Sequence, residues 1–156
     1  MRRPVTLLAV LLAVLAAGCG ADHRSSQEAY ARHYTEVSAK LQQAFARIPA
    51  STGDTPLAQV ADRLDQSAKA LGDASKGFDE IEPPKASEAS NAKLVKGLGD
   101  LAAIYRRGAA AARKGDHQGV TRTLQGLPKS KPFQAVAAAQ RELAAQGVTP
   151  TATTGG

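Results

Sequence analysis

Apolar residues recur along this chain at spacings of three and four, the period of a helix that buries one face. Between residues 25 and 48 this spacing predicts a first helix, which Pro49 ends. Ser25, with Glu28 three residues later, has the pattern of a capping box at the start of that helix. Its apolar positions are Tyr30, Tyr34, Val37, Leu41, Ala44 and Ile48.

Two longer helices are expected next. Thr55, as a cap, and Pro56, in the first turn, begin a helix that Pro83 and Pro84 end. A third helix extends from about residue 84 to 114, and Gly97, Gly99 and Gly108 in it indicate either close approach to a neighbour or weak points. The apolar positions of the two helices are Leu57, Val60, Leu64, Ser67, Leu71, Ala74, Phe78, Ile81, Leu94, Leu98, Leu101, Tyr105 and Ala112.

The last helical element is predicted in two pieces. A short helix begins at Asp116, Pro128 and Pro132 interrupt, and a second helix covers about 133 to 146 with an apolar face. That face is expected to hold Phe133, Val136, Gln140 and Leu143. No segment alternates as a strand does, so the pattern predicts an all-α protein, an antiparallel four-helix bundle whose last helix is split.

Residues 1–19 follow a different pattern. Arg2 and Arg3 precede an apolar run at 5–17, which fits a secretory signal and is shorter than the roughly 20 residues of a membrane-spanning helix. The run closes with Leu-Ala-Ala-Gly and then Cys19, the one cysteine of the chain. This stretch resembles the lipobox of bacterial lipoproteins. The resemblance implies cleavage before Cys19 and a diacylglyceryl group on its thiol; ordinary secretion with a free cysteine is the alternative.

These patterns divide the chain into four parts. Residues 1–18 are expected to be a signal peptide, 19–24 the lipidated cysteine and a short spacer, 25–147 the bundle, and 148–156 a disordered tail rich in Thr and Gly. Five spacer residues reach at most about 17 Å, so the bundle is expected close to the headgroups. The lipobox resemblance implies the extracytoplasmic face of the cell membrane. The Ala-rich last helix, with its Gly-Val ending, is also similar in style to lipoproteins of high-GC actinobacteria, a general likeness that names no activity.

Large apolar side chains are sparse. Residues 19–156 contain 22 Leu, Ile, Val and Phe residues, fewer than most folded domains have. Alanine, the best helix former, is abundant, which favours a helical domain with a small apolar core over disorder. We therefore expect a mostly helical domain of modest stability.

Charge is distributed unevenly. The net charge is −3 for residues 20–82 and +7 for residues 83–156. Six cations on the exposed side of the third helix form a candidate ridge: Lys93, Lys96, Arg106, Arg107, Arg113 and Lys114. The ridge is either an ordinary solvated face or a surface that binds headgroups, an anionic envelope polymer or an acidic protein partner. Nucleic acid is not expected as a partner, because the export signal would carry the chain out of the cytoplasm.

The sequence offers little catalytic chemistry. His23, His33 and His117 are scattered, and His33 with Glu36 is interpreted as a surface pair. No Glu-x-x-His pair of a bundle metal site is present, and no serine has the context of an activated nucleophile. We therefore expect neither catalytic residues nor a metal or other cofactor.

Two functions remain open. The first is a lipid-anchored bundle that binds or scaffolds a partner at the cell envelope. The second is a small-ligand carrier with a pocket inside the bundle near Tyr30, Tyr34 and Tyr105, although these three side chains also suit a packed core with the hydroxyl at its edge. A dry cavity of several hundred Å³ in the interior of the bundle would favour the carrier. A filled core beside a contiguous basic face would favour the interaction module.

Overall fold

The computed structural model describes residues 24–50 and 54–149. All regular structure in these two ranges is helical, which confirms the expected all-α class. The elements are α1 (Gln27–Ala46), α2 (Leu57–Asp79), the 3-10 turn η1 (Lys85–Ser87), α3 (Glu88–Arg113), α4 (His117–Gly126), the 3-10 turn η2 (Leu127–Lys129) and α5 (Lys131–Ala145). None of these helices is long and apolar enough to cross a membrane.

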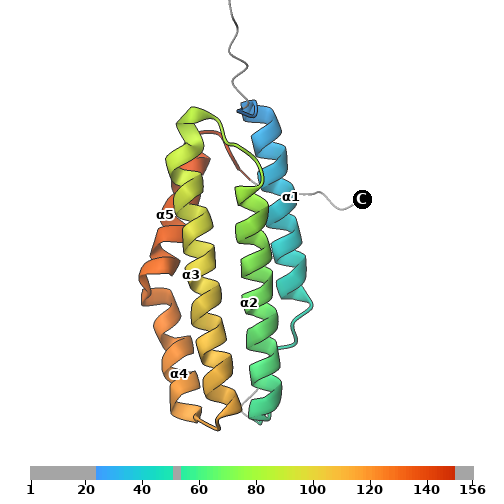
Figure 1. The fold of residues 1–156 in the computed structure, drawn as a ribbon, viewed down its shortest axis with the longest axis vertical. Helices are drawn as coiled ribbons and strands as arrows, with labels where there is room; N and C mark the ends of the chain where they lie inside the picture. Colours follow the sequence, from blue (N-terminus) through green and yellow to red (C-terminus); the bar gives the residue numbers. More distant parts are fainter. Residues whose placement is uncertain (1–23, 51–53, 150–156) are drawn as a thin grey trace, which may run out of the picture.

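The helices form a bundle with four columns (Figure 1). Helices α1, α2 and α3 run in alternating directions, and α4 and α5 follow each other along α3 as the fourth column. The contact between α2 and α3 is the most extensive; α4 and α5 pack on α3, and α1 packs on α2. The split of the last helix at η2, which contains Pro128, is therefore as predicted.

The predicted helix starts differ from the observed ones by one to four residues. Helix α3 begins at Glu88, after η1, and α5 begins at Lys131 with Pro132 in its first turn, so Pro132 does not interrupt the helix. Ser26, not Ser25, caps α1, and its Oγ accepts a hydrogen bond from the Ala29 backbone N–H at 3.1 Å. The Ser25 hydroxyl instead donates to the Glu82 carbonyl at 2.7 Å. At α2, Pro56 occupies the cap position with an extended ψ of 139°, so Thr55 lies one residue too early to cap the helix.

Two contiguous sets of buried side chains make up the core. The larger one, here called the large cluster, draws on α1, α2, α3, η2 and the end of α5. Its buried members are Tyr30, Tyr34, Val37, Leu71, Ala74, Phe78, Leu94, Leu98, Leu101, Ala102, Leu127, Ala139, Leu143 and Val148. The small cluster lies where α2 begins, α3 ends and α4 begins, and consists of Ala61, Leu64, Ala109, Ala112 and Val120.

The expected stripes of α1, α2 and α3 supply most of the large cluster, but the end of the chain differs from expectation. Phe133 is 45% exposed, and Gln140 is exposed too. Val148, which we assigned to the tail, is buried instead. Gly147 adopts a φ of +82°, which turns the chain so that the Val148 N–H donates to the Leu143 carbonyl at 2.9 Å. This ending is a Schellman-type cap. The rest of the predicted tail, beyond residue 149, lies outside the described residues.

Two of the three glycines of α3 mark close helix contacts. A methyl group added at Gly97 would lie 2.7 Å from Val136 Cγ2, and one at Gly108 would lie 3.2 Å from Thr123 Cγ2. At Gly99 the nearest atom, Ser75 Oγ, would be 3.6 Å away, which is ordinary contact. The absence of a side chain is thus needed at the seams with α5 and α4, and not at Gly99.

Candidate functional site

Cys19 and the predicted signal peptide lie outside the described residues, but the place where the chain enters the bundle is described. Arg24 Nη1 donates to Glu88 Oε2 at 2.8 Å. The backbone N–H and the hydroxyl of Ser25 both donate to the carbonyl of Glu82, at 3.0 and 2.7 Å. These bonds fix the start of the domain to the α2–α3 connection. We call this end of the bundle, where α1 begins and α5 ends, the entry end, and the opposite end the far end.

The three tyrosines are part of the packed interior. Tyr30 and Tyr34 are 0% and 2% exposed, and Tyr105 is half-buried beside both clusters. The Tyr30 hydroxyl donates to Asn91 Oδ1 at 2.7 Å, and Asn91 Nδ2 donates to the Phe78 carbonyl at 3.1 Å. The Tyr34 ring packs on that of Phe78 with centroids 5.1 Å apart.

Burial raises the pKa of all three tyrosines, and the neighbouring Tyr34 raises that of Tyr30 further. Raised values are expected for phenols that lose water without gaining a cation. None of the three lines the groove or the depression described next. The tyrosines therefore fill space and satisfy buried polar groups.

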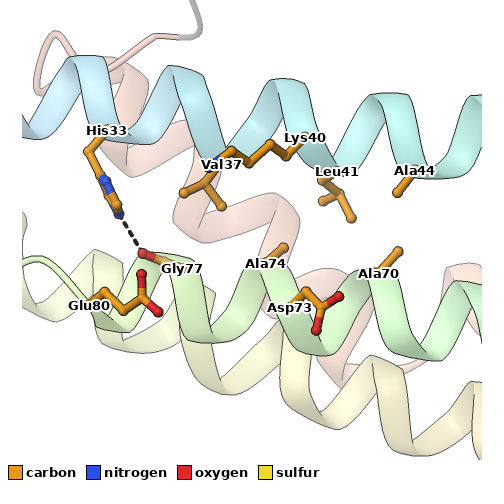
Figure 2. A pocket seen from close by; sticks show the side chains of 10 residues that line it. All are labelled: His33, Val37, Lys40, Leu41, Ala44, Ala70, Asp73, Ala74, Gly77 and Glu80. Atoms are coloured by element: carbon orange, nitrogen blue, oxygen red, sulfur yellow. Dashed lines mark hydrogen bonds between the residues drawn. The ribbon is translucent and has the colours of Figure 1, made fainter.

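An open groove of about 300 Å³ lies between α1 and α2 (Figure 2). Its wall residues are His33, Val37, Lys40, Leu41, Ala44, Ala70, Asp73, Ala74, Gly77 and Glu80. His33 Nε2 donates to the Gly77 carbonyl at 2.5 Å, so the interpretation of His33 as a surface partner of Glu36 is wrong. Gly77 lies in the last turn of α2, whose carbonyls lack helical partners, and His33 satisfies one of them.

Helix α1 approaches α2 closely at the part of the groove nearer the entry end. A methyl group added at Gly77 would lie 3.0 Å from Val37 Cγ2. Asp73 on the α2 wall pairs with Lys69, 2.5 Å away. The groove thus offers a small apolar strip with charged edges, and it contains no nucleophile with an adjacent base.

A second depression, of about 360 Å³, lies at the far end between the end of α1, the start of α2 and α4. Its walls include Leu57, Val60, Val120 and Leu124. Leu124 of α4, which lines this depression, is 40% exposed. At this end α4 packs on α3, leaving its flank toward α1 open.

Half of the predicted basic ridge is neutralised by carboxylates. Lys93 Nζ donates to Glu142 Oε1 of α5 at 2.9 Å. This hydrogen bond and the one from the Ser90 hydroxyl lower the pKa of Glu142. Lys96 pairs with Asp100 at 2.6 Å, and Arg113 pairs with Asp65 of α2. The partners across helices, 48 and 49 residues away in sequence, carry no signal in the local pattern and were missed.

The other three ridge cations differ. Arg106, Arg107 and Lys114 are exposed, and none has an ion pair with another described residue. Arg106 extends toward α2, where its Nη2 would lie 3.7 Å from a methyl group on Gly72. All three belong to the C-terminal part of α3, near the far end.

Metal ligands are not gathered in the described part of the chain. Residues 24–50 and 54–149 contain no group of three or more His, Cys, Asp or Glu side chains that could hold a metal ion. No family model, curated protein or solved structure matches the chain.

Proposed function

We propose that this protein is a lipid-anchored module of the cell envelope: an antiparallel four-helix bundle, held at the extracytoplasmic face of the membrane through Cys19, that binds a partner. The observation that carries the proposal is the attachment of the chain at the entry end. The lipobox-like stretch ends at Cys19, and Arg24 is already bonded to Glu88. A folded domain that begins five residues after the cysteine would be held close to the membrane by lipid on that thiol.

The energetics of the anchor support the same proposal. A single myristoyl-sized chain holds a protein to a membrane only marginally, and two chains hold it firmly, at about 0.8 kcal/mol per buried CH₂ group. A diacylglyceryl group supplies two chains. A basic residue near an anionic surface contributes only about 1 kcal/mol, and salt weakens it. Lipid on Cys19 would therefore dominate attachment.

The carrier alternative gains no support from the tyrosines, because Tyr30 and Tyr34 fill the core. The groove and the far-end depression combine aliphatic side chains with polar and charged ones, and both are open to solvent. A catalytic role has no support among the described residues either. Binding of a partner on the outer surface is the function that the filled core leaves best supported.

Cys19→Ala tests the anchor, with Ser25→Ala as a matched control that keeps the cysteine. We expect the N-terminal peptide of the wild-type and Ser25→Ala proteins to begin at Cys19 with a diacylglyceryl mass, measured by mass spectrometry of the membrane fraction. The Cys19→Ala protein should lack the adduct, remaining as an uncut precursor or passing to the medium. An unmodified Cys19 thiol in wild-type protein would contradict the proposal.

A further inference from the structure

The two ends of the bundle carry opposite charge. At the entry end, residues 24–28, 79–88 and 142–149 hold six acidic and two basic side chains. The acidic ones are Glu28, Asp79, Glu80, Glu82, Glu88 and Glu142. Toward the far end, residues 43–50, 54–65 and 106–122 hold seven basic and four acidic side chains, the acidic ones being Asp54, Asp62, Asp65 and Asp116. Asp116 is engaged as the cap of α4, where it accepts from the Gly119 N–H at 2.7 Å.

Four of the far-end cations form what we call the distal patch: Arg106, Arg107, Lys114 and Arg122. All four are exposed, and none has an ion pair with another described residue. The dipole of α3 explains at most Lys114, because the dipole acts within the last turn. Arg106 and Arg107 lie earlier in α3, and Arg122 is on α4. The helix dipole therefore does not explain why these three arginines occur together.

The residues of the distal patch lie on α3 and α4. Arg106 extends toward α2 near Gly72. Arg107 and Arg122 each precede a residue of an α3–α4 contact, Gly108 against Thr123, which places them at a similar level of the bundle. Lys114 follows Arg107 by two helical turns, about 10 Å along α3. Arg106 lines an open hollow of about 460 Å³ together with Asp65 and Asp73, and Arg122 lines another of about 290 Å³. The positive groups thus spread over an open surface.

We propose that the distal patch binds a linear polyanion, a polymer with repeated phosphate or carboxylate groups, held away from the membrane. The position of the patch away from the membrane depends on the proposed lipid anchor. The binding of a polyanion depends only on the charge pattern and holds without the anchor. A polymer with regularly spaced anions can contact dispersed cations in turn, and arginine pairs well with phosphate and carboxylate oxygens. The patch contains no large apolar side chain, which a stable protein interface needs at its centre.

Headgroups fit the patch less well than a polymer. With the anchor at Cys19, the spacer keeps the acidic entry end within about 17 Å of the lipid. Helix α3 has 26 residues, about 39 Å at the usual rise, and the distal patch occupies its opposite end. Charges are screened over about 8 Å at physiological salt, so an upright bundle presents the patch beyond the reach of the headgroup charge.

The test uses the lipidated protein in zwitterionic vesicles and fluorescent polyphosphate, with poly-glutamate as the carboxylate probe. Arg106→Gln, Arg107→Gln and Lys114→Gln together should weaken polyphosphate binding at least about tenfold and flatten its salt dependence. The matched control, Lys93→Gln, Lys96→Gln and Arg141→Gln, removes equal charge nearer the entry end and should change binding less than about twofold. Circular dichroism verifies that both proteins are folded.

Three results would overturn the inference. Equal losses in both triple variants would mean that only net charge matters. Wild-type binding no stronger than that of the distal variant would mean that the patch does not bind. Preference for added anionic vesicles over either polymer would assign the patch to headgroups. Because lipidation is read separately from the mass of Cys19, a failed anchor and a failed polymer site give different results.

Discussion

Around the large cluster the bundle is filled by aromatic and leucine side chains from α1, α2, α3 and α5, whereas the small cluster contains three alanines, one leucine and one valine. Stabilisation by burial scales with the apolar area removed from water, so the entry-end half contributes most of it. The half that carries the distal patch has fewer large apolar side chains in its core, and it contains the far-end depression. Stability and exposed charge are thus separated along the axis of one bundle.

The largest expected contrast comes from the same substitution in the two clusters. Leu94→Ala, at a side chain 1% exposed in the large cluster, should lower the free energy of unfolding by about 4 kcal/mol. Leu64→Ala, in the small cluster beside the far-end depression, should cost about 2 kcal/mol, because an open wall can relax into the space. Urea unfolding followed by circular dichroism measures both.

Complete loss of the folding transition in Leu94→Ala alone would agree with this order. A larger cost for Leu64→Ala would reverse the comparison and identify the far-end half as the stable one.

A smaller contrast concerns the seams of α3. Gly97→Ala should destabilise the protein by about 2 kcal/mol, since the added methyl group meets Val136 Cγ2 at 2.7 Å and the Pro132 carbonyl at 3.3 Å. Gly108→Ala should cost less, because its nearest contacts are side-chain carbons of Thr123 and Leu64. Thermal unfolding with Gly99→Ala as control, expected to be neutral or stabilising by up to about 1 kcal/mol, separates packing from helix propensity. Equal costs at Gly97 and Gly108 would show that the two seams are equally tight.

The smallest of the expected effects belongs to the buried phenol. Tyr30→Phe removes the hydrogen bond to Asn91 Oδ1 and leaves a buried acceptor unpaired, at a cost of about 1 to 2 kcal/mol at neutral pH. Denaturant unfolding measures this loss. An unchanged midpoint would mean that Asn91 finds another donor.

The tyrosines also predict how stability depends on pH. Their pKa values in the folded state are raised by burial, while the unfolded chain ionises near the ordinary value of about 10. The stabilisation is therefore complete below pH 10 and is lost as the pH rises through the folded-state values. Tyrosinate absorbance should appear together with loss of helix, and Tyr30→Phe should make the decline shallower. Tyrosinate formation in a chain that stays helical would contradict this.

The sequence predicted the helices well because their apolar stripes repeat locally. Leu94, Leu98 and Leu101 are buried as their spacing requires, and the proline-containing break between α4 and α5 lies where it was expected. Helix starts were less certain because adjacent serines compete. Ser25 and Ser26 both suit a cap, and only the contact of Ser25 with Glu82, which is distant in sequence, decides between them.

The candidate site was predictable only in part. Six cations were placed on the exposed side of α3 correctly, but spacing on one helix does not show which carboxylates of other helices face it. Lys93 and Arg113 are neutralised by Glu142 and Asp65, whereas Arg107 is not. Val148 was missed for a similar reason, because burial after a glycine turn depends on what the turn faces.

The attachment at the entry end also has a mechanical consequence. A pull on the chain at Arg24, directed out of the bundle, would act along the axis of α1, which lies lengthwise against α2 (Figure 1). Such a force shears α1 along α2 and does not separate the two helices from one end. All contacts along the α1–α2 interface therefore oppose the force at the same time. The bonds of Arg24 and Ser25 would bear the force first. The Val37 side chain, which packs closely against Gly77, would then oppose the sliding of α1 along α2 by steric contact.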